Sequence, residues 1–140
     1  MNTLNFLKKL DVHSLVDFRG NLNIAELGRF DEFAVKRIYY ISNVPKGVER
    51  GAHAHKSLKQ VFFAISGSFT LKVTDGVNSD SVQLNSHSCG YFLSSGFWRV
   101  LSDFSQDGVC LVLASEYYDP DDYIHKFDEF LDWRISVEKS

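Results

Sequence analysis

The stretch RGAHAHK at residues 50–56, followed by Gln60 and Gly67, decides how this chain is interpreted. Side chains two residues apart along a strand point to the same side, so His53 and His55 are predicted to share one face. The alanines on either side of His53 leave room for a ligand on that face. We therefore expect a strand that presents two imidazoles to a pocket. The alternatives are two solvated strand histidines or a decayed metal site.

Short apolar, aromatic and β-branched runs surround this stretch and alternate with turn residues from residue 34 to residue 116. Strands that recur at intervals of about 8–12 residues are typical of all-β sandwiches and barrels. The N-terminal segment is also strand-like, with a turn at residues 19–21. The expected strands cover residues 35–41, 60–65, 69–73, 81–84, 91–93, 97–101 and 109–115.

The C-terminal segment changes to a helical period. Asp119 and Pro120 suit the cap and the first position of a helix. Tyr123, Phe127 and Phe130 then recur at helical spacing and give one apolar face. We predict a single helix packed on the outside of the β domain.

Length and composition favour one globular domain over residues 1–140, with 44 % apolar and 24 % charged residues. A net charge of −3 argues against a nucleic-acid binder, whose domain should be basic. No apolar run approaches the ~20 residues that cross a bilayer, and residues 1–15 lack the apolar region of a secretory signal. Cys89 and Cys110 are expected to be reduced core residues. We therefore expect a cytoplasmic protein that binds neither nucleic acid nor membrane.

The spacing HxH, four residues, Gln, six residues, Gly resembles the first motif of the cupin superfamily, which implies a double-stranded β-helix, or jelly-roll barrel. In that motif the residue at position 60 is normally a metal-binding Glu, but here it is Gln60. The later stretch that should supply another His has none, and Arg99 falls where that ligand would lie. Two histidines beside a guanidinium are a poor divalent metal site, whereas an arginine suits phosphate or a carbonyl oxygen. We expect no metal and no other cofactor, which counts against a metal-dependent oxygenase.

Other basic residues are candidates for an anion site. Residues 35–40, VKRIYY, alternate, so Arg37 and Tyr39 face the same way. An inward arginine needs a partner, which a phosphate would supply, although the alternation also allows Arg37 to face solvent. Arg37 and Arg50 are predicted to hold a pyrophosphate, with Tyr39 and Gln60 lining the pocket. The remaining histidines, which lie in polar surroundings and are expected at the surface, are His13, His87 and His125.

Longer motifs resemble one family, the dTDP-4-keto-6-deoxyglucose 3,4-ketoisomerases of bacterial deoxysugar biosynthesis, which are small WxcM-like cupins. The resemblance covers about residues 15 to 130. The motifs that carry it are VKRIYY at 35–40, RGAHAHK at 50–56, LKQV at 58–61, LASEYYD at 113–119 and DYI at 122–124.

The resemblance implies an isomerase that converts dTDP-4-keto-6-deoxy-D-glucose to a dTDP-3-keto-6-deoxyhexose. Its product would feed an aminotransferase that makes 3-amino-3,6-dideoxy sugars for surface glycans, such as lipopolysaccharide O-antigen, or for antibiotics. It also implies a homodimer that exchanges N-terminal strands, with His53 and His55 as acid–base groups. An imidazole can take and return a proton near neutral pH, and Arg99 could stabilise an enediolate oxygen. The alternatives are a nucleotide-sugar 3,5-epimerase and a non-catalytic sugar-nucleotide-binding cupin.

The chain departs from the family pattern in two places. It has Ser95-Gly96 where Gly-Pro is usual. Some family members carry His and others carry Arg after the tryptophan at position 98, and Arg99 matches the members with Arg. Arg19, a predicted substrate-binding residue, instead matches the members that carry His after this tryptophan. The resemblance implies that this pair of positions bears on the C4 configuration of the product, so galacto and gluco both stay open.

Overall fold

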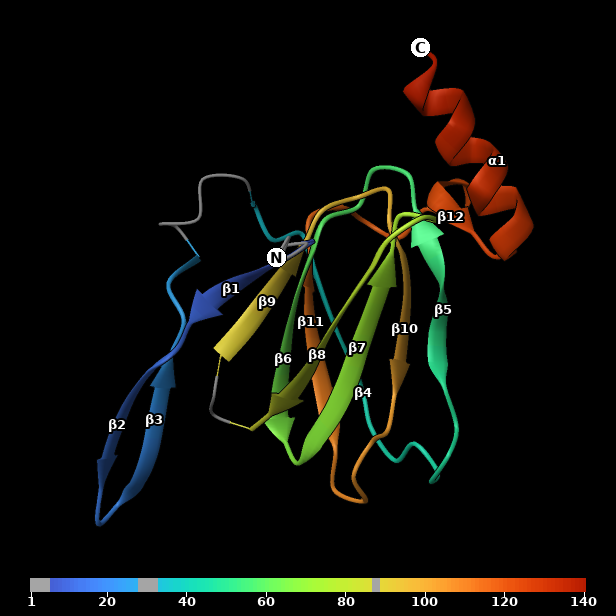
Figure 1. The fold of residues 1–140 in the computed structure, drawn as a ribbon. Coiled ribbons are helices and arrows are strands. Elements are labelled where there is room, and N and C mark those ends of the chain that lie inside the picture. Colours follow the sequence, from blue (N-terminus) through green and yellow to red (C-terminus); the bar gives the residue numbers. More distant parts are fainter. Residues whose placement is uncertain (1–5, 28–32, 87–88) are drawn as a thin grey trace.

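The alternating runs form antiparallel strands in the computed structural model, which describes residues 6–27, 33–86 and 89–140 (Figure 1). The predicted runs are recovered to within about two residues at each end, because turn residues separate them. His87 lies outside the described residues. The strands are β1 (Leu7–Asp11), β2 (His13–Asp17), β3 (Gly20–Ile24), β4 (Arg37–Ile41), β5 (Arg50–His55), β6 (Gln60–Ser66), β7 (Ser68–Thr74), β8 (Ser79–Asn85), β9 (Cys89–Leu93), β10 (Trp98–Ser102), β11 (Val109–Ala114) and β12 (Tyr123–Ile124).

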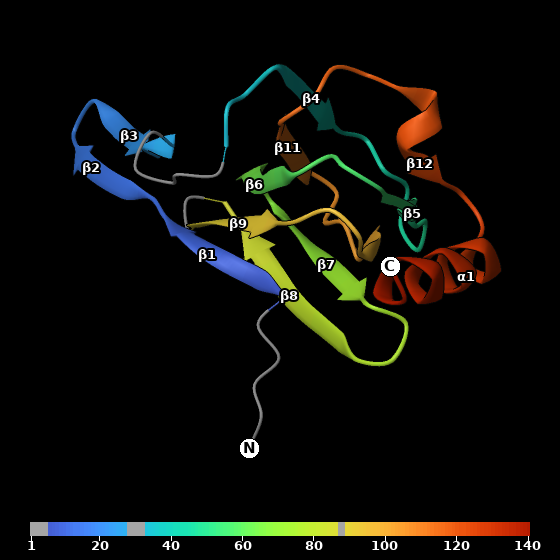
Figure 2. The same cartoon turned by 90° about the horizontal axis from the view of Figure 1, so that it is seen from above.

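Ten of these strands form two five-stranded sheets, in the orders β1-β9-β6-β11-β4 and β12-β5-β10-β7-β8. The two sheets face each other across the interior when the molecule is seen from above (Figure 2). Neighbours such as β6 and β11, or β10 and β5, are distant in sequence and pair in antiparallel register. The predicted all-β jelly-roll barrel with a C-terminal helix is thereby confirmed.

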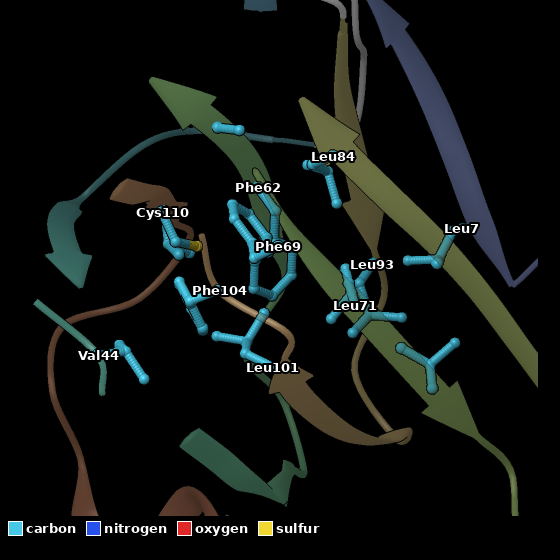
Figure 3. Close-up of a cluster of buried hydrophobic side chains, with 13 residues drawn as sticks. Leu7, Val44, Phe62, Phe69, Leu71, Leu84, Leu93, Leu101, Phe104 and Cys110 are labelled. Atoms are coloured by element: carbon cyan, nitrogen blue, oxygen red, sulfur yellow. The ribbon is translucent and has the colours of Figure 1, made fainter. Parts of the chain in front are cut away.

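An apolar cluster fills the space between the sheets (Figure 3). Phe62, Phe69 and Leu101 are each 0 % exposed, and Phe69 stacks on Phe104 with ring centroids 5.2 Å apart. Cys110 belongs to this cluster, and burial raises the pKa of its thiol to about 12. Both cysteines are free and buried, as expected.

The C-terminal segment differs from the prediction in where its helix begins. Asp119 does cap a turn that starts at Pro120, but that turn is a short 3₁₀ helix, η2 (Pro120–Asp122). Tyr123 lies not on a helical face but in β12, which pairs with β5. The helix α1 runs from Phe127 to Glu138 and packs the fully buried Phe130 beside the sheet edge. Pairing with β5 overrides the helical spacing, because it satisfies the backbone groups of residues 123–124.

The N-terminal hairpin of β2 and β3 forms a separate two-stranded sheet that extends away from the barrel (Figure 1). Its turn is the predicted one, and Gly20 there has φ +122°, a conformation that favours glycine. The hairpin exposes four apolar side chains, with Phe18 98 % exposed. In the described parts of the chain, no helix combines the length and the apolar character that a membrane span requires.

Candidate active site

Three neighbouring strands of one sheet, β12, β5 and β10, bring the two histidines to Arg99. In β5, His53 lies opposite Arg99 of β10, and His55 lies opposite Tyr123 of β12. Antiparallel register, rather than closeness in sequence, therefore joins the histidine pair to the arginine.

The two predicted histidines are in direct contact. The Nε2 atoms of His53 and His55 are 3.1 Å apart, and the rings meet edge to face. His55 is 4 % exposed and reaches the Asp122 carboxylate through Nδ1 at 3.1 Å. His53 is only partly buried and lines the pocket described below. The pair thus has an outer member that a ligand can touch and an inner member behind it.

Arg99 is a buried cation that faces this pair. It is 3 % exposed, and its Nη2 lies 2.9 Å from His53 Nε2. Its guanidinium also lies 5.4 Å from the centre of the Phe62 ring. Gly51 makes room for it, because a Cβ at that position would lie 2.5 Å from Arg99 Nη1, and Gly51 has φ +69°. A glycine is therefore favoured at position 51, because the positive φ is strained for other residues and a Cβ would displace the Arg99 guanidinium.

Tyr39 connects Arg99 to Gln60. The Tyr39 hydroxyl accepts a hydrogen bond from Gln60 Nε2 at 2.6 Å and another from Arg99 Nη2 at 3.1 Å. With both acceptor positions used, the Tyr39 O–H proton is available to an oxygen in the pocket. Burial raises the pKa of Tyr39, although the Arg99 charge opposes the effect, so the phenol keeps its proton.

These side chains surround a pocket of about 510 Å³, a size typical of small-molecule sites. Five of the eight predicted site residues line it: Arg37, Tyr39, Arg50, His53 and Arg99. The predicted alternation of β4 is confirmed, because Arg37 and Tyr39 are half-buried on the same side.

Three predicted residues lie outside the pocket wall. His55 and Gln60 sit one layer behind, in contact with His53 and Tyr39 respectively. Gln60 is 1 % exposed, so within this chain it acts on the pocket through Tyr39 rather than by lining it. Arg19 lies at the tip of the hairpin, where it pairs with Asp17 at 2.6 Å, with its side chain 75 % exposed. The structure of one chain does not bring Arg19 to the pocket.

The surroundings keep both histidines neutral. Burial, with the positive charge of Arg99, lowers the pKa of His53 to about 2 and that of His55 to about 3. The Asp122 carboxylate, which contacts His55 Nδ1, also accepts hydrogen bonds from the backbone N–H groups of Ser57 and Leu58. A neutral imidazole has a free lone pair and can act as a base.

The sequence patterns missed three members of the site: Asp122, Tyr123 and His125. Tyr123 lines the pocket and lies 5.0 Å from the His53 ring, while His125 stacks on Tyr123 at 5.3 Å. His125 is exposed, as predicted, yet its ring is 6.0 Å from that of His53. The DYI motif at 122–124 was the available signal, but the helical spacing concealed it.

The donor set around the histidines does not fit a metal ion. Gln60 directs its amide N–H toward Tyr39, and the Arg99 guanidinium occupies the approach to His53 Nε2. Within residues 6–27, 33–86 and 89–140, no group of three or more His, Cys, Asp or Glu side chains is arranged to bind one. The polar groups present are instead suited to an anion or a carbonyl oxygen.

Comparison with characterised proteins agrees with this geometry. The TDP-4-oxo-6-deoxy-alpha-D-glucose-3,4-oxoisomerase of Aneurinibacillus thermoaerophilus is 37 % identical over 134 residues, covering 94 % of this chain and 96 % of that protein. A mutant of the 3,4-ketoisomerase QdtA from Thermoanaerobacterium thermosaccharolyticum, solved with TDP-4-keto-6-deoxyglucose, superposes with a TM-score of 0.88 at 34 % identity. That match covers 96 % of this chain and 97 % of the other.

A more distant similarity shows only the fold. The 4-keto-6-deoxy sugar epimerase NovW of Streptomyces spheroides is 19 % identical, with a TM-score of 0.76 over 88 % of this chain and 70 % of its own.

The family model described as FdtA, WxcM-like, C-terminal matches residues 6–134. With that match over most of its length, the chain belongs to the FdtA family of WxcM-like proteins.

Proposed function

We propose that this protein is a sugar-nucleotide 3,4-ketoisomerase that converts dTDP-4-keto-6-deoxy-D-glucose to a dTDP-3-keto-6-deoxyhexose. The observation that carries the proposal is the neutral His53 at the pocket wall, backed by His55 and faced by Arg99. The ketoisomerases that resemble this chain over more than nine-tenths of its length support the same reaction. The product would serve the synthesis of 3-amino-3,6-dideoxy sugars for glycans such as the O-antigen.

The reaction moves one carbon-bound proton and balances without a redox partner. The 4-ketone acidifies the C3 proton, which His53 removes to leave an enediolate across C3 and C4. The base then returns a proton to C4, and the proton of the C3 hydroxyl passes to the oxygen on C4 as the carbonyl forms at C3. His53 is the proposed base, and His55 its partner in holding the proton, because only His53 lines the pocket.

Arg99 and Tyr39 are suited to the charge that develops during this step. Arg99 supplies a fixed positive charge in a buried position, where electrostatic stabilisation of an oxyanion is strongest. Tyr39 offers its remaining O–H proton, because its oxygen already accepts two hydrogen bonds. Gln60 positions Tyr39.

The basic groups at the pocket mouth are the proposed diphosphate site. Arg37 and Arg50 line the same pocket as His53, in a chain whose net charge is −3. Local positive potential is needed to attract a dianionic nucleotide to such a chain. Arg37 also lies 5.5 Å from the Tyr39 ring and 5.8 Å from the Tyr118 ring, which hold its guanidinium near the opening.

Product analysis in deuterated water tests the reaction. A ketoisomerase places the carbonyl at C3 and deuterium at C4, whereas a 3,5-epimerase leaves the ketone at C4. Coupling to a 3-aminotransferase would trap a labile 3-keto product as an amine. A non-catalytic sugar-nucleotide-binding module would bind dTDP and leave the substrate unchanged.

The N-terminal hairpin supports a homodimer in which two copies exchange these strands. Leu15, Val16, Phe18 and Leu22 are each at least half exposed in one chain, which is costly unless a partner covers them. An apolar groove of about 370 Å³ on the outer face of the first sheet, with Phe63 and Leu111 in its lining, offers a surface for such a hairpin. Exchange would also carry Arg19 toward the partner's pocket. Light scattering of the parent and of Phe18→Asp tests this, with a dimer expected only for the parent.

We also propose that residues 1–140 form one cupin domain. We also place the protein in the cytoplasm, because its two buried cysteines are free thiols, as is typical of a reducing compartment.

A further inference from the structure

Asp122 holds the inner histidine of the site by its ring nitrogen. Its Oδ2 lies 3.1 Å from His55 Nδ1, and the two side chains are 14 % and 4 % exposed. An ionised carboxylate can only accept, so Nδ1 of His55 must carry the hydrogen. In neutral His55 the lone pair is then on Nε2, which is the atom that faces His53.

The backbone fixes the orientation of this carboxylate. Its Oδ1 accepts a hydrogen bond from the N–H of Ser57 at 2.7 Å, and the Asp122 carbonyl accepts one from Lys56 at 2.9 Å. The carboxylate cannot rotate without losing the contact with Ser57. Oδ2 is thereby left directed at His55.

The lone pair on His55 Nε2 matters because of what surrounds His53 Nε2. Arg99 Nη2 always donates and lies 2.9 Å from that atom, which therefore accepts in the resting site. Two nitrogen acceptors then face each other at 3.1 Å, a separation that one shared proton would turn into a good hydrogen bond. The histidine pair thus has a place for one additional proton.

We propose that Asp122 is a positioning residue that holds His55 in the Nδ1–H tautomer, so that the histidine pair can receive and share the proton taken from C3. The kinetic part of this inference rests on the proposed isomerase function; the tautomer does not. When the shared proton makes the pair cationic, the Asp122 charge balances it.

The variant Asp122→Asn separates this role from simple anchoring. The Asn oxygen would keep the Ser57 hydrogen bond, which places the amide N–H₂ where Oδ2 now faces His55. His55 Nδ1 must then accept, its hydrogen moves to Nε2, and that hydrogen fills the place between the two rings. Asp119→Asn is the matched control, because Asp119 caps the same turn through Asp121 at 3.0 Å and carries the same charge.

Nitrogen-15 NMR of the imidazoles in the substrate-free protein reads the tautomer directly, with His55→Gln to assign the signal. We expect Nδ1–H in the parent and in Asp119→Asn, and Nε2–H in Asp122→Asn. In the isomerase assay, kcat of Asp122→Asn should fall at least tenfold, up to the ~10²–10⁴-fold contribution of acid–base catalysis, with KM changed by less than about twofold.

An Nε2–H tautomer in the parent, or an unchanged tautomer in a folded Asp122→Asn, overturns the inference. So does a kcat reduced by less than tenfold. If the tautomer changes as expected but the parent produces no 3-keto sugar, the proposed function fails while the role of Asp122 in fixing His55 stands.

Discussion

One end of the barrel interior is polar, and the other is apolar, although the same strands supply both. In β10, Arg99 faces the histidines while Leu101 lies in the core, and in β6 Gln60 and Phe62 divide in the same way. All four side chains are at most 3 % exposed. A shift of two residues along a strand therefore changes the environment from a hydrogen-bonded network to packed hydrocarbon.

The two ends are stabilised by different means. Side chains of the apolar end contribute by losing water and filling space, so volume matters most. Side chains of the polar end are stabilised mainly by the hydrogen bonds that they make, as for Gln60 with Tyr39, although the buried Arg99 Nε has no partner among the described residues. The apolar end should therefore determine stability, and the polar end activity.

The largest expected effect comes from His53→Asn at the polar end. Removing the proposed base should lower kcat by about 10²–10⁴-fold, the usual contribution of general acid–base catalysis. The melting temperature should stay close to that of the parent, because His53 is only partly buried. Steady-state kinetics and calorimetry on the same samples check both statements. Full turnover in a folded His53→Asn protein would remove His53 from the mechanism.

Phe69→Ala should have the opposite profile at the apolar end. Phe69 is 0 % exposed and stacks on Phe104, so its loss leaves a cavity. The free energy of unfolding should fall by about 3–5 kcal/mol, as for other buried Phe-to-Ala changes. Denaturant titration measures the loss, and kcat of the fraction that remains folded should be near the parental value. A stable but inactive variant would show that the two ends are not separable.

Removing one cation from the pocket mouth should have a smaller effect, confined to binding. Loss of a charge-assisted hydrogen bond to phosphate costs about 1.5–3 kcal/mol, or about 10- to 150-fold in affinity. Calorimetric titration of dTDP into Arg37→Ala and Arg50→Ala measures it. Lys72→Ala is the charge-matched control, because Lys72 is exposed on β7 and does not line the pocket. If both arginine variants bind like the control, the diphosphate lies elsewhere.

The smallest effect concerns how the polar end alters stability with pH. The pKa of His55 falls from 6.5 to about 3 on folding, so between these values the unfolded chain binds a proton that the folded chain does not. Stability should therefore decrease as the pH falls below 6.5, with a slope of at most ~1.4 kcal/mol per pH unit for one histidine, and should gain nothing from this group above it.

Denaturant midpoints at pH 7 and pH 5 test this statement. The parent should lose more stability than His55→Gln over that interval, because the variant has no imidazole at this position to titrate. Equal losses in the two proteins would mean that His55 does not contribute to the pH dependence.

The same division explains how much could be predicted from the sequence. Alternation along a strand fixes which side a residue faces, which sufficed for His53, His55 and Arg99. Alternation does not say which neighbouring residue a side chain contacts. Gln60 was therefore predicted to line the pocket, whereas in the structure it lies behind Tyr39. Local backbone geometry determines which side of a strand a residue faces, and tertiary packing determines which residues its side chain contacts.

Two further differences have the same origin. Tyr123 fits a helical spacing with Phe127, and only its pairing with the distant β5 makes it part of a strand and of the site. Arg19 was correctly placed in a turn, but the position of that turn relative to the pocket depends on how the hairpin leaves the barrel. Contacts between distant segments carry this information, and a local pattern does not contain it.

Gly51 contributes to the site by having no side chain, because the Arg99 guanidinium occupies the space beside it. Any replacement would meet both an unfavourable positive φ and the Arg99 guanidinium, 2.5 Å from its Cβ. In a library that substitutes every position in turn, residue 51 should therefore tolerate as little variation as the histidines, although it donates no proton and contributes no charge. A low number of tolerated substitutions at residue 51 would show that the Arg99 guanidinium needs the space that a side chain there would occupy.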